Sequence, residues 1–309
     1  MEQFLTISGR AVSRFSFGAM QFGGTADAAT SGEIYGVCRG AGINFFDTAN
    51  SYTEGRSERI IGDLIAPERD DVFLATKCAY SGASAAVIEA EFSESRRRLK
   101  TDVVDLLYIH RWDDQVPLEE SLGVLAGFVT AGSVRYLGLS NFAAWQVMKA
   151  VRTGAELGVS VSVVQPMYNL VKRQAEVELL PMAEAEGFAV CPYSPLGGGL
   201  LTGKYGAGGD GRLSTNAQYA SRYREDWMHR CATALGEVAT GRGVAPATLA
   251  VAWVARHKGV FGPIISARSV DQVKPSLAGM DFVMDDALYA RLSALSPTPP
   301  PATDRTEVV

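Results

Sequence analysis

Four side chains that can share a proton with a carbonyl oxygen fall near the ends of apolar runs in this sequence. Asp47 closes the run Ile43–Asp47, and Tyr52 follows it by five residues. Lys77 and His110 stand at the ends of two later runs. An acid, a phenol, an ammonium group and an imidazole each need a partner when they are desolvated, so their convergence predicts an active site.

The chemistry of this set follows from the acidity of tyrosine. A free tyrosine has a pKa of about 10, which makes it a poor proton donor at neutral pH. A neighbouring cation lowers that pKa, so we expect Lys77, held by Asp47, to make Tyr52 a usable general acid with a pKa below the ordinary value. His110 is expected to orient a carbonyl oxygen. Such a set suits protonation of the oxygen while a hydride from a nicotinamide attacks the carbon.

The apolar runs alternate with helical patterns along the chain, which predicts parallel strands joined by crossover helices. The eight expected strands are Phe15–Gly18, Ile43–Asp47, Val72–Thr76, Leu106–His110, Tyr136–Ser140, Val161–Gln165, Ala189–Tyr193 and Pro263–Ile265. Eight such units favour a (β/α)8 TIM barrel, in which strand ends share one mouth. An open doubly wound sheet is the alternative, but the glycine spacing of "FGAMQFGG" does not fit its nucleotide-binding motif.

The segments between these runs complete the expected organisation. Helices are predicted over Ser31–Ala41, Ala85–Lys100, 118–129, Ala143–Leu157, Glu178–Glu186 and Asp226–Arg256. The N-terminus resembles a β-hairpin that turns at Ser8–Gly9 and acts as a lid, and Gly203–Asp226 is a long polar loop suited to covering a cofactor. We expect one domain over residues 1–296 and a Pro-rich, mobile tail over 297–309.

Composition narrows the possible partners and compartment. The 309 residues carry a net charge of −5, which argues against nucleic acid or anionic membrane as a partner. The four cysteines are isolated in the sequence and the three histidines are well separated, which favours reduced thiols and no metal site. No signal peptide or membrane-length apolar run is visible, so a cytoplasmic location is expected.

Seven segments, in collinear order over roughly residues 5–295, resemble the aldo-keto reductase superfamily. They are "GINFFDTANSYTEGRSE", "VFLATKC", "TDVVDLLYIHRWD", "GSVRYLGLSNF", "VQPMYNL", "PYSPLGGGLLTGKY" and "PIISARSVDQV". The "GGGLLTGKY" loop is similar to the bacterial branch that is related to potassium-channel β-subunits. The resemblance implies a barrel that binds NADPH without a Rossmann motif and an NADP-dependent reductase acting reversibly on an aldehyde or ketone and its alcohol.

The resemblance also implies roles for residues by position. Tyr52 would be the proton donor, assisted by Lys77 and Asp47, and His110 would position the carbonyl. The cofactor would contact Ser140, Asn141, Gln165, Tyr193, Ser194, Leu196, Gly198, Ser266, Arg268 and Gln272. Gly18, Met20 and Trp112 would flank the substrate.

The adenosine end departs from the family pattern, which often has Lys or Gly at the position of Ser266. Arg268 is the candidate clamp for a 2′-phosphate, because guanidinium matches phosphate in two hydrogen bonds. Ser269 and Gln272 read as a capping box, while Pro275 is expected to kink that helix or delay its start. NADPH is favoured and NADH use is possible.

Two other functions remain open from the sequence. Lys77 at a barrel strand end also suits a class I aldolase-type lyase that forms a Schiff base. A regulatory module that holds cofactor as a redox sensor is the third possibility. The substrate is not determined by these residues: a sugar, a steroid-like ketone, a small aldehyde and pyridoxal all remain possible, and so does any oligomeric state.

Overall fold

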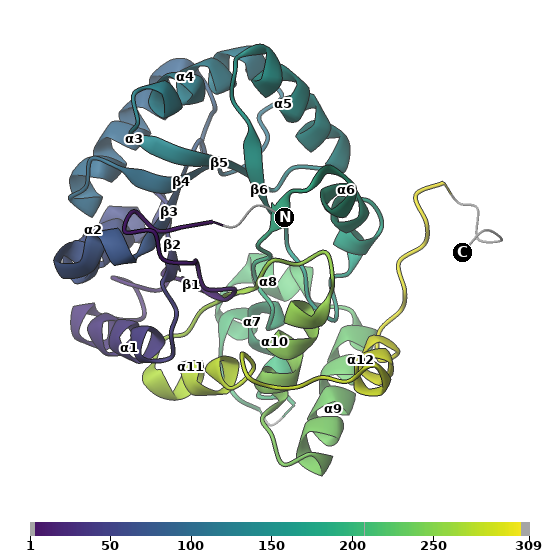
Figure 1. The fold of residues 1–309 in the computed structure, drawn as a ribbon. Coiled ribbons are helices and arrows are strands. Elements are labelled where there is room, and N and C mark those ends of the chain that lie inside the picture. The colour runs from purple at the N-terminus through teal and green to yellow at the C-terminus, as the bar shows by residue number, and fades with distance from the viewer. Residues whose placement is uncertain (1–3, 207, 304–309) are drawn as a thin grey trace.

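Parallel strands form the inner layer of the protein in the computed structural model, which describes residues 4–206 and 208–303 (Figure 1). The strands are β1 (Ser16–Gly18), β2 (Phe45–Asp47), β3 (Phe73–Cys78), β4 (Val104–Ile109), β5 (Val134–Ser140), β6 (Val161–Gln165), β7 (Ala189–Val190) and β8 (Ile264–Ile265). They pair in the order β7-β6-β5-β4-β3-β2-β1-β8. Backbone hydrogen bonds from Phe261 to Val190 and from Ile264 to Pro192 join the two ends of this sheet. The predicted (β/α)8 barrel is confirmed.

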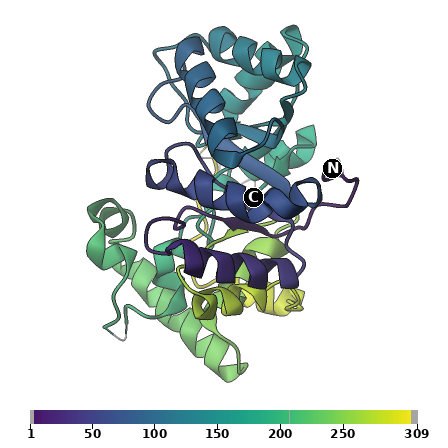
Figure 2. The same ribbon diagram turned by 90° about the vertical axis from the view of Figure 1, so that its left-hand side faces the viewer.

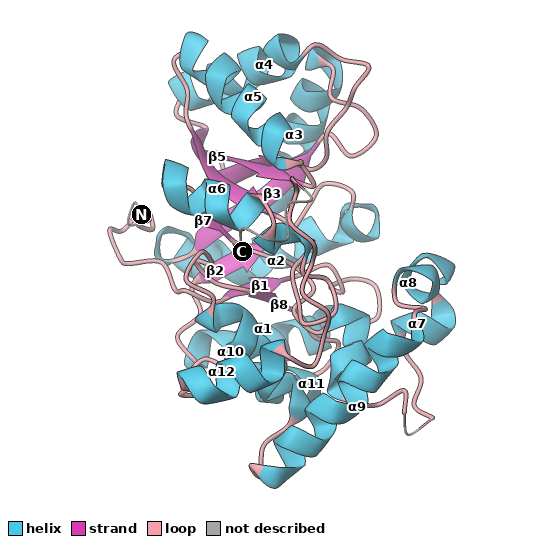
Figure 3. Ribbon diagram, turned by 90° about the vertical axis from the view of Figure 1, so that its right-hand side faces the viewer, coloured by secondary structure: helices cyan, strands magenta, loops and turns pink. Residues whose placement is uncertain are grey.

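Helices form the outer layer around these strands (Figure 2). They are α1 (Ala28–Gly40), α2 (Arg56–Ile65), α3 (Ala85–Leu99), α4 (Leu118–Thr130), α5 (Ala144–Glu156), α6 (Leu179–Glu186), α7 (Arg212–Thr215), α8 (Ala217–Arg222), α9 (Asp226–Gly241), α10 (Pro246–Arg256), α11 (Val270–Leu277) and α12 (Asp286–Ser293). The helical stretch expected over Asp226–Arg256 is divided into two helices, because Gly243 takes a φ of 67° and Pro246 starts a new helix. Figure 3 shows α7 and α8 at the edge of the molecule, beyond α9.

Side-chain alternation divides the buried residues into two cores. Phe45 on β2 and Phe73 on β3 point into the barrel, together with Leu106 and Tyr108 on β4. The intervening residues point outward and pack against the helices. Gly138 makes room inside the barrel, because a β-carbon there would collide with the Tyr108 ring. The inward series of β2 to β7 therefore continue, two residues at a time, to a polar residue at the carboxyl end.

The N-terminal hairpin closes the opposite end of the barrel. Leu5 bridges Ala11 in antiparallel fashion around a turn in which Gly9 has a φ of 84°, as predicted. The Phe4 ring packs against the rings of Phe73 and Tyr136, so the start of the chain plugs the amino ends of the strands (Figure 1). Residues 304–309 of the expected mobile tail lie outside the described residues.

Among the described residues, no helix taken alone has the length and apolar character needed to cross a bilayer. The bent pair α9 and α10, which meet at 102°, reaches that length and composition only when the two are taken together.

Candidate active site

The inward-facing series of six strands end in polar side chains at one mouth of the barrel. On β2 the series Phe45, Asp47 ends in a carboxylate, and on β3 the series Phe73, Ala75, Lys77 ends in an ammonium group. The corresponding residues at the ends of β4, β5, β6 and β7 are His110, Ser140, Gln165 and Tyr193. Strand register therefore carries these groups to the face where barrel enzymes place their chemistry.

Lys77 and Asp47 form an ion pair beneath the mouth. Both side chains are almost fully buried, and Lys77 Nζ donates to a carboxylate oxygen of Asp47 and, at 2.8 Å, to the carbonyl of Thr48. Gln165 Nε2 donates to the second Asp47 oxygen at 3.0 Å. Burial is the largest single effect and would lower the pKa of Lys77, but the charges and hydrogen bonds of Asp47 and Tyr52 together outweigh it, so the pKa of Lys77 is raised. Lys77 is therefore a protonated ammonium group at neutral pH.

Tyr52 reaches the same place from a strained loop after β2. The next three residues, Thr53, Glu54 and Gly55, have φ values of 47°, 58° and 81°, and left-handed conformations are costly for the first two. The guanidinium of Arg98 lies against Gly55, where a β-carbon would collide with it. Arg98 also donates to the carbonyl of Asn50 at 3.1 Å, so α3 supports the loop that presents Tyr52.

The expected low pKa of Tyr52 is not found. Burial raises the pKa of Tyr52 above its ordinary value, Lys77 opposes this rise and Asp47 adds to it. Lys77 Nζ lies 4.9 Å from the centre of the Tyr52 ring, close enough to attract the phenolate, but Asp47 neutralises much of its charge. The protein therefore keeps Tyr52 in the neutral, proton-donating form throughout the physiological range.

His110 stands beside Tyr52 as a neutral imidazole. The two ring centres are 5.7 Å apart in an edge-to-face arrangement. Burial, followed by the charges of Lys77 and Arg111, lowers the pKa of His110 to about 3. The backbone carbonyl of His110 accepts a hydrogen bond of 2.9 Å from Asn141 Nδ2. A neutral imidazole can share a hydrogen bond with a carbonyl oxygen but does not supply a proton at neutral pH.

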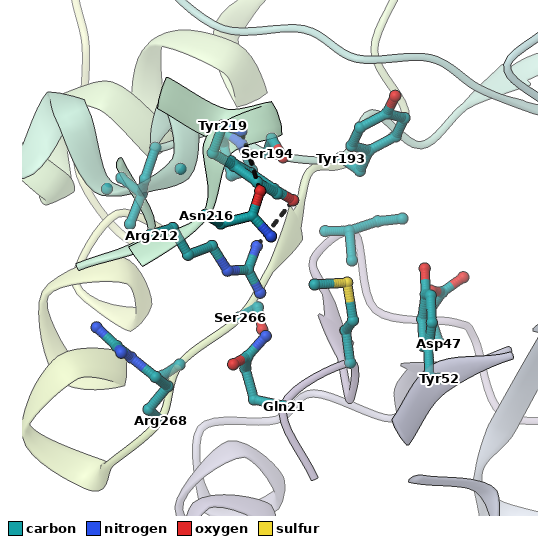
Figure 4. A pocket seen from close by; sticks show the side chains of 18 of the residues that line it. Gln21, Asp47, Tyr52, Tyr193, Ser194, Arg212, Asn216, Tyr219, Ser266 and Arg268 are labelled. Carbon is teal, nitrogen blue, oxygen red and sulfur yellow. Dashed lines mark hydrogen bonds between the residues drawn. The ribbon is translucent and has the colours of Figure 1, made fainter. Parts of the chain in front are cut away.

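One elongated cavity of about 920 Å³ connects these side chains to the long segment after β7 (Figure 4). Figure 4 shows Asp47 and Tyr52 at one end of it and Arg212 and Arg268 at the other. Its wall includes the predicted residues Gly18, Met20, Asp47, Tyr52, His110, Ser140, Asn141, Gln165, Tyr193, Ser194, Leu196, Gly198, Ser266, Arg268 and Gln272. Lys77 lies buried beneath this wall. Trp112 is not in the wall and packs against Phe142 and Trp145 instead.

Comparison with known proteins identifies the family. The profile of the Aldo/keto reductase family matches residues 14–297. The chain belongs to the aldo/keto reductase family. It is 34% identical over 294 residues to a probable voltage-gated potassium channel subunit beta of Arabidopsis thaliana, covering 89% of this chain and 90% of that relative.

Two further relatives carry reductase or oxidoreductase names. The uncharacterized oxidoreductase YrpG of Bacillus subtilis is 32% identical over 320 residues, or 96% of both chains. Norsolorinic acid reductase B of Aspergillus parasiticus is 33% identical over 302 residues, or 85% of this chain and 75% of that relative. Family membership and these relatives support an oxidoreductase that uses a nicotinamide cofactor for carbonyl reduction.

At the middle of the cavity, this aldo/keto reductase offers amides and a ring that fit a nicotinamide. Ser140 Oγ donates to the backbone carbonyl of Gln165 at 3.1 Å. Tyr193 donates its hydroxyl hydrogen to Asn141 Oδ1 at 2.7 Å, which fixes the Tyr193 ring beside the cavity. Asn141 has a φ of 59°, a left-handed conformation that Asn tolerates better than most residues. These polar groups and the flat ring match a carboxamide on a planar heterocycle.

The next part of the cavity is suited to phosphate. Gly197, Gly198 and Gly199 have φ values of 57°, 65° and 95°, so the chain forms a tight turn along the wall. The cavity wall here carries cations that sequence reasoning did not single out, Lys204 and Arg212. Arg212 donates to the Tyr219 hydroxyl at 3.0 Å (Figure 4). Both lie in the long loop Gly203–Asp226, and Lys204 also lies in the segment "PYSPLGGGLLTGKY" that carries part of the family resemblance.

The far end is suited to an adenosine phosphate. Ser269 Oγ accepts from the Gln272 amide at 3.3 Å, which is one half of the expected capping box. Gln272 Oε1 accepts from the amide of Arg268 at 3.2 Å, one residue before the N-cap residue Ser269. The helix α11 starts at Val270, so Pro275 does not delay it. Pro275 lines the cavity, and Pro246 adds a second apolar surface.

The described residues contain no group of three or more His, Cys, Asp or Glu side chains that could hold a metal ion.

Proposed function

We propose that this protein is an NADP-dependent reductase that converts an aldehyde or ketone to the alcohol, reversibly, with Tyr52 as the general acid. The observation that carries the proposal is the buried Lys77–Asp47 pair beneath a neutral Tyr52 in the wall of the long cavity. The cofactor, when bound, supplies a hydride to the carbonyl carbon. Ser140, Asn141, Gln165 and Tyr193 would hold its nicotinamide portion.

The protein's own residues would handle the oxygen and its proton. Tyr52 and His110 would hydrogen-bond the carbonyl oxygen and thereby orient the carbon. As negative charge develops on the oxygen, Tyr52 would donate its proton, and Lys77 would stabilise the phenolate that remains. Because Tyr52 is only partly buried and stands at the mouth, it would regain a proton from solvent after the alcohol leaves.

Arg268 supports a preference for NADPH over NADH. Its side chain lies in the wall at the adenosine end (Figure 4), and a guanidinium can bind a phosphate through two hydrogen bonds. Lys204 adds a second cation in the same wall. We infer a cytoplasmic, reducing setting for the protein, because the four cysteines are free and buried.

The lyase alternative fits the site less well. A Schiff base requires a neutral amine with access to the substrate. The Lys77 side chain is fully buried and paired with Asp47, and its pKa is raised, so its nitrogen is neither free nor neutral.

The regulatory alternative has a specific observation in its favour. A probable voltage-gated potassium channel subunit beta is among the relatives, with 34% identity. Cofactor binding without turnover would favour that role for this chain. The complete set of Asp47, Tyr52, Lys77 and His110 favours catalysis instead.

Turnover with a panel of aldehydes and ketones, followed by NADPH or NADH absorbance, tests the proposal. Tyr52→Phe should lower kcat by roughly 10²- to 10⁴-fold. Fluorescence titration should show NADPH affinity within about threefold of wild type, because the Tyr52 hydroxyl is assigned to the carbonyl oxygen. Full turnover by Tyr52→Phe would exclude Tyr52 as the general acid. If none of the aldehydes and ketones in the panel caused oxidation of NADPH or NADH, the reductase function would be excluded.

A further inference from the structure

The substrate end of the cavity contains an arginine with no role in the proposed mechanism. Arg111 follows His110 directly, is exposed and lines the cavity. Among the residues that the structure describes, its guanidinium has neither a salt bridge nor a hydrogen-bond partner. Asp113, two residues along the chain, uses its carboxylate oxygens on the backbone amides of Ala83 and Gln115. The Arg111 charge is therefore available to a ligand.

Tyr80 holds this guanidinium in place. The Arg111 Cζ atom lies 5.2 Å from the centre of the Tyr80 ring, a cation–π contact that limits the freedom of a long side chain. The other neighbour of the Tyr80 ring is His110, with ring centres 5.0 Å apart. Tyr80 therefore contacts both the imidazole of His110 and the guanidinium of Arg111.

The position of Tyr80 is enforced by its backbone. Ala79 has a φ of 64°, a left-handed conformation that is unfavourable for alanine. The Ala79 amide donates to the Glu91 carboxylate of α3 at 2.6 Å, which fixes this turn after β3. The turn leaves Tyr80 49% exposed at the mouth. A strained residue next to an exposed ring in a cavity wall is typical of a functional position.

The charge balance of the cavity wall favours an anion. Asp47 is the one carboxylate that the described residues contribute to this wall, and Lys77 neutralises it. The cations in the wall are Lys204, Arg111, Arg212, Arg222 and Arg268. Lys204, Arg212 and Arg268 belong to the part assigned to cofactor phosphates, so Arg111 brings positive charge to the part next to His110.

We propose that Arg111, braced on Tyr80, binds a carboxylate of the substrate, so that the protein prefers aldehydes or ketones that also carry a carboxylate. This inference rests on the proposed function. A guanidinium binds a carboxylate through two parallel hydrogen bonds, and bracing reduces the entropy lost on binding. The carbonyl would then face Tyr52 and His110.

Kinetics with a matched pair of substrates test the inference. The probes are 4-carboxybenzaldehyde and its neutral amide, 4-formylbenzamide, at saturating NADPH. The ratio of kcat/KM for acid over amide should fall at least about tenfold in Arg111→Met, and Arg111→Lys should keep part of it because the charge remains. Arg152→Met, which alters an exposed arginine of α5, is the matched control and should keep the wild-type ratio. A ratio that does not change in Arg111→Met overturns the inference while leaving the reductase function intact.

A binding measurement keeps the inference testable without turnover. Calorimetry would compare 4-(hydroxymethyl)benzoate with 4-(hydroxymethyl)benzamide, both titrated into the NADPH-loaded protein, in which the alcohol cannot be oxidised. Wild type should bind the benzoate at least about tenfold more tightly than the amide, and Arg111→Met should remove that difference. Equal affinities in wild type, or an unchanged difference in Arg111→Met, would overturn the assignment. Absence of turnover together with the expected binding would instead count against the reductase function alone.

Discussion

Replacing Lys77 by methionine separates the structural from the catalytic contribution of the buried ion pair. Lys77 Nζ lies 4.9 Å from the centre of the Tyr52 ring. At that separation and an effective dielectric constant of about 20, a unit charge stabilises a phenolate by about 3 kcal/mol. Asp47 offsets part of this energy, so kcat for a neutral aldehyde should fall roughly ten- to hundredfold. Stopped-flow absorbance of NADPH under single-turnover conditions would measure the chemical step directly.

The same change has a structural cost that must be controlled. Lys77→Met leaves the Asp47 carboxylate buried with Gln165 as its remaining partner, and breaking a buried pair in this way costs about 3–5 kcal/mol of folding free energy. The double variant with Asp47→Asn removes both charges and should recover most of that stability in urea unfolding. Its turnover should stay low, because no cation stabilises the phenolate. A double variant with nearly wild-type kcat, or a single variant within about threefold of wild type, would refute the role of the Lys77 charge.

Three further predictions follow from the geometry. His110 has a pKa near 3 in the folded protein and about 6.5 in the unfolded chain, so its contribution to stability is complete above pH 6.5 and falls at lower pH. Between pH 7 and pH 5, the free energy of unfolding in urea should fall by about 2 kcal/mol more in wild type than in His110→Gln. Equal decreases in the two proteins would contradict the burial argument. Gly55→Ala should lower the free energy of unfolding by about 1–3 kcal/mol and reduce kcat, because Gly55 has a φ of 81° and a β-carbon there would collide with Arg98. Gly36→Ala in α1 is the control, because a β-carbon at Gly36 meets no other atom nearby. Equal effects of the two substitutions would refute this reasoning. Arg268→Met should raise KM for NADPH about tenfold while KM for NADH changes less than threefold, and equal changes would remove Arg268 from the 2′-phosphate.

Strand alternation explains why much of the site was predictable from the sequence. Once Asp47, Lys77 and His110 were placed at strand ends, the barrel fixed their meeting at one mouth. Arg212 was not predictable in the same way, because its position depends on how a long loop folds over the cavity. The direction of the Tyr52 pKa shift also needed coordinates, since it is the balance of desolvation against two opposite charges.

Trp112 and Tyr80 show the limit of reading residue types near a motif. Both are aromatic residues shortly after a functional strand end. The sequence resemblance favoured Trp112, yet its ring packs against Phe142 while Tyr80 lines the cavity. The difference comes from the left-handed turn at Ala79, a backbone conformation that alanine does not signal in a sequence.

The plug formed by Phe4 and the polar mouth lie at opposite ends of the same strands. Phe73 and Lys77 belong to one inward series on β3, yet the first contributes to holding the barrel together and the second lies at the site of chemistry. Substitutions at the mouth can therefore alter substrate choice without opening the plug, and repacking of the plug can compensate for a destabilised mouth. For directed evolution, residues at the mouth and residues of the plug can be varied in separate libraries of the same domain.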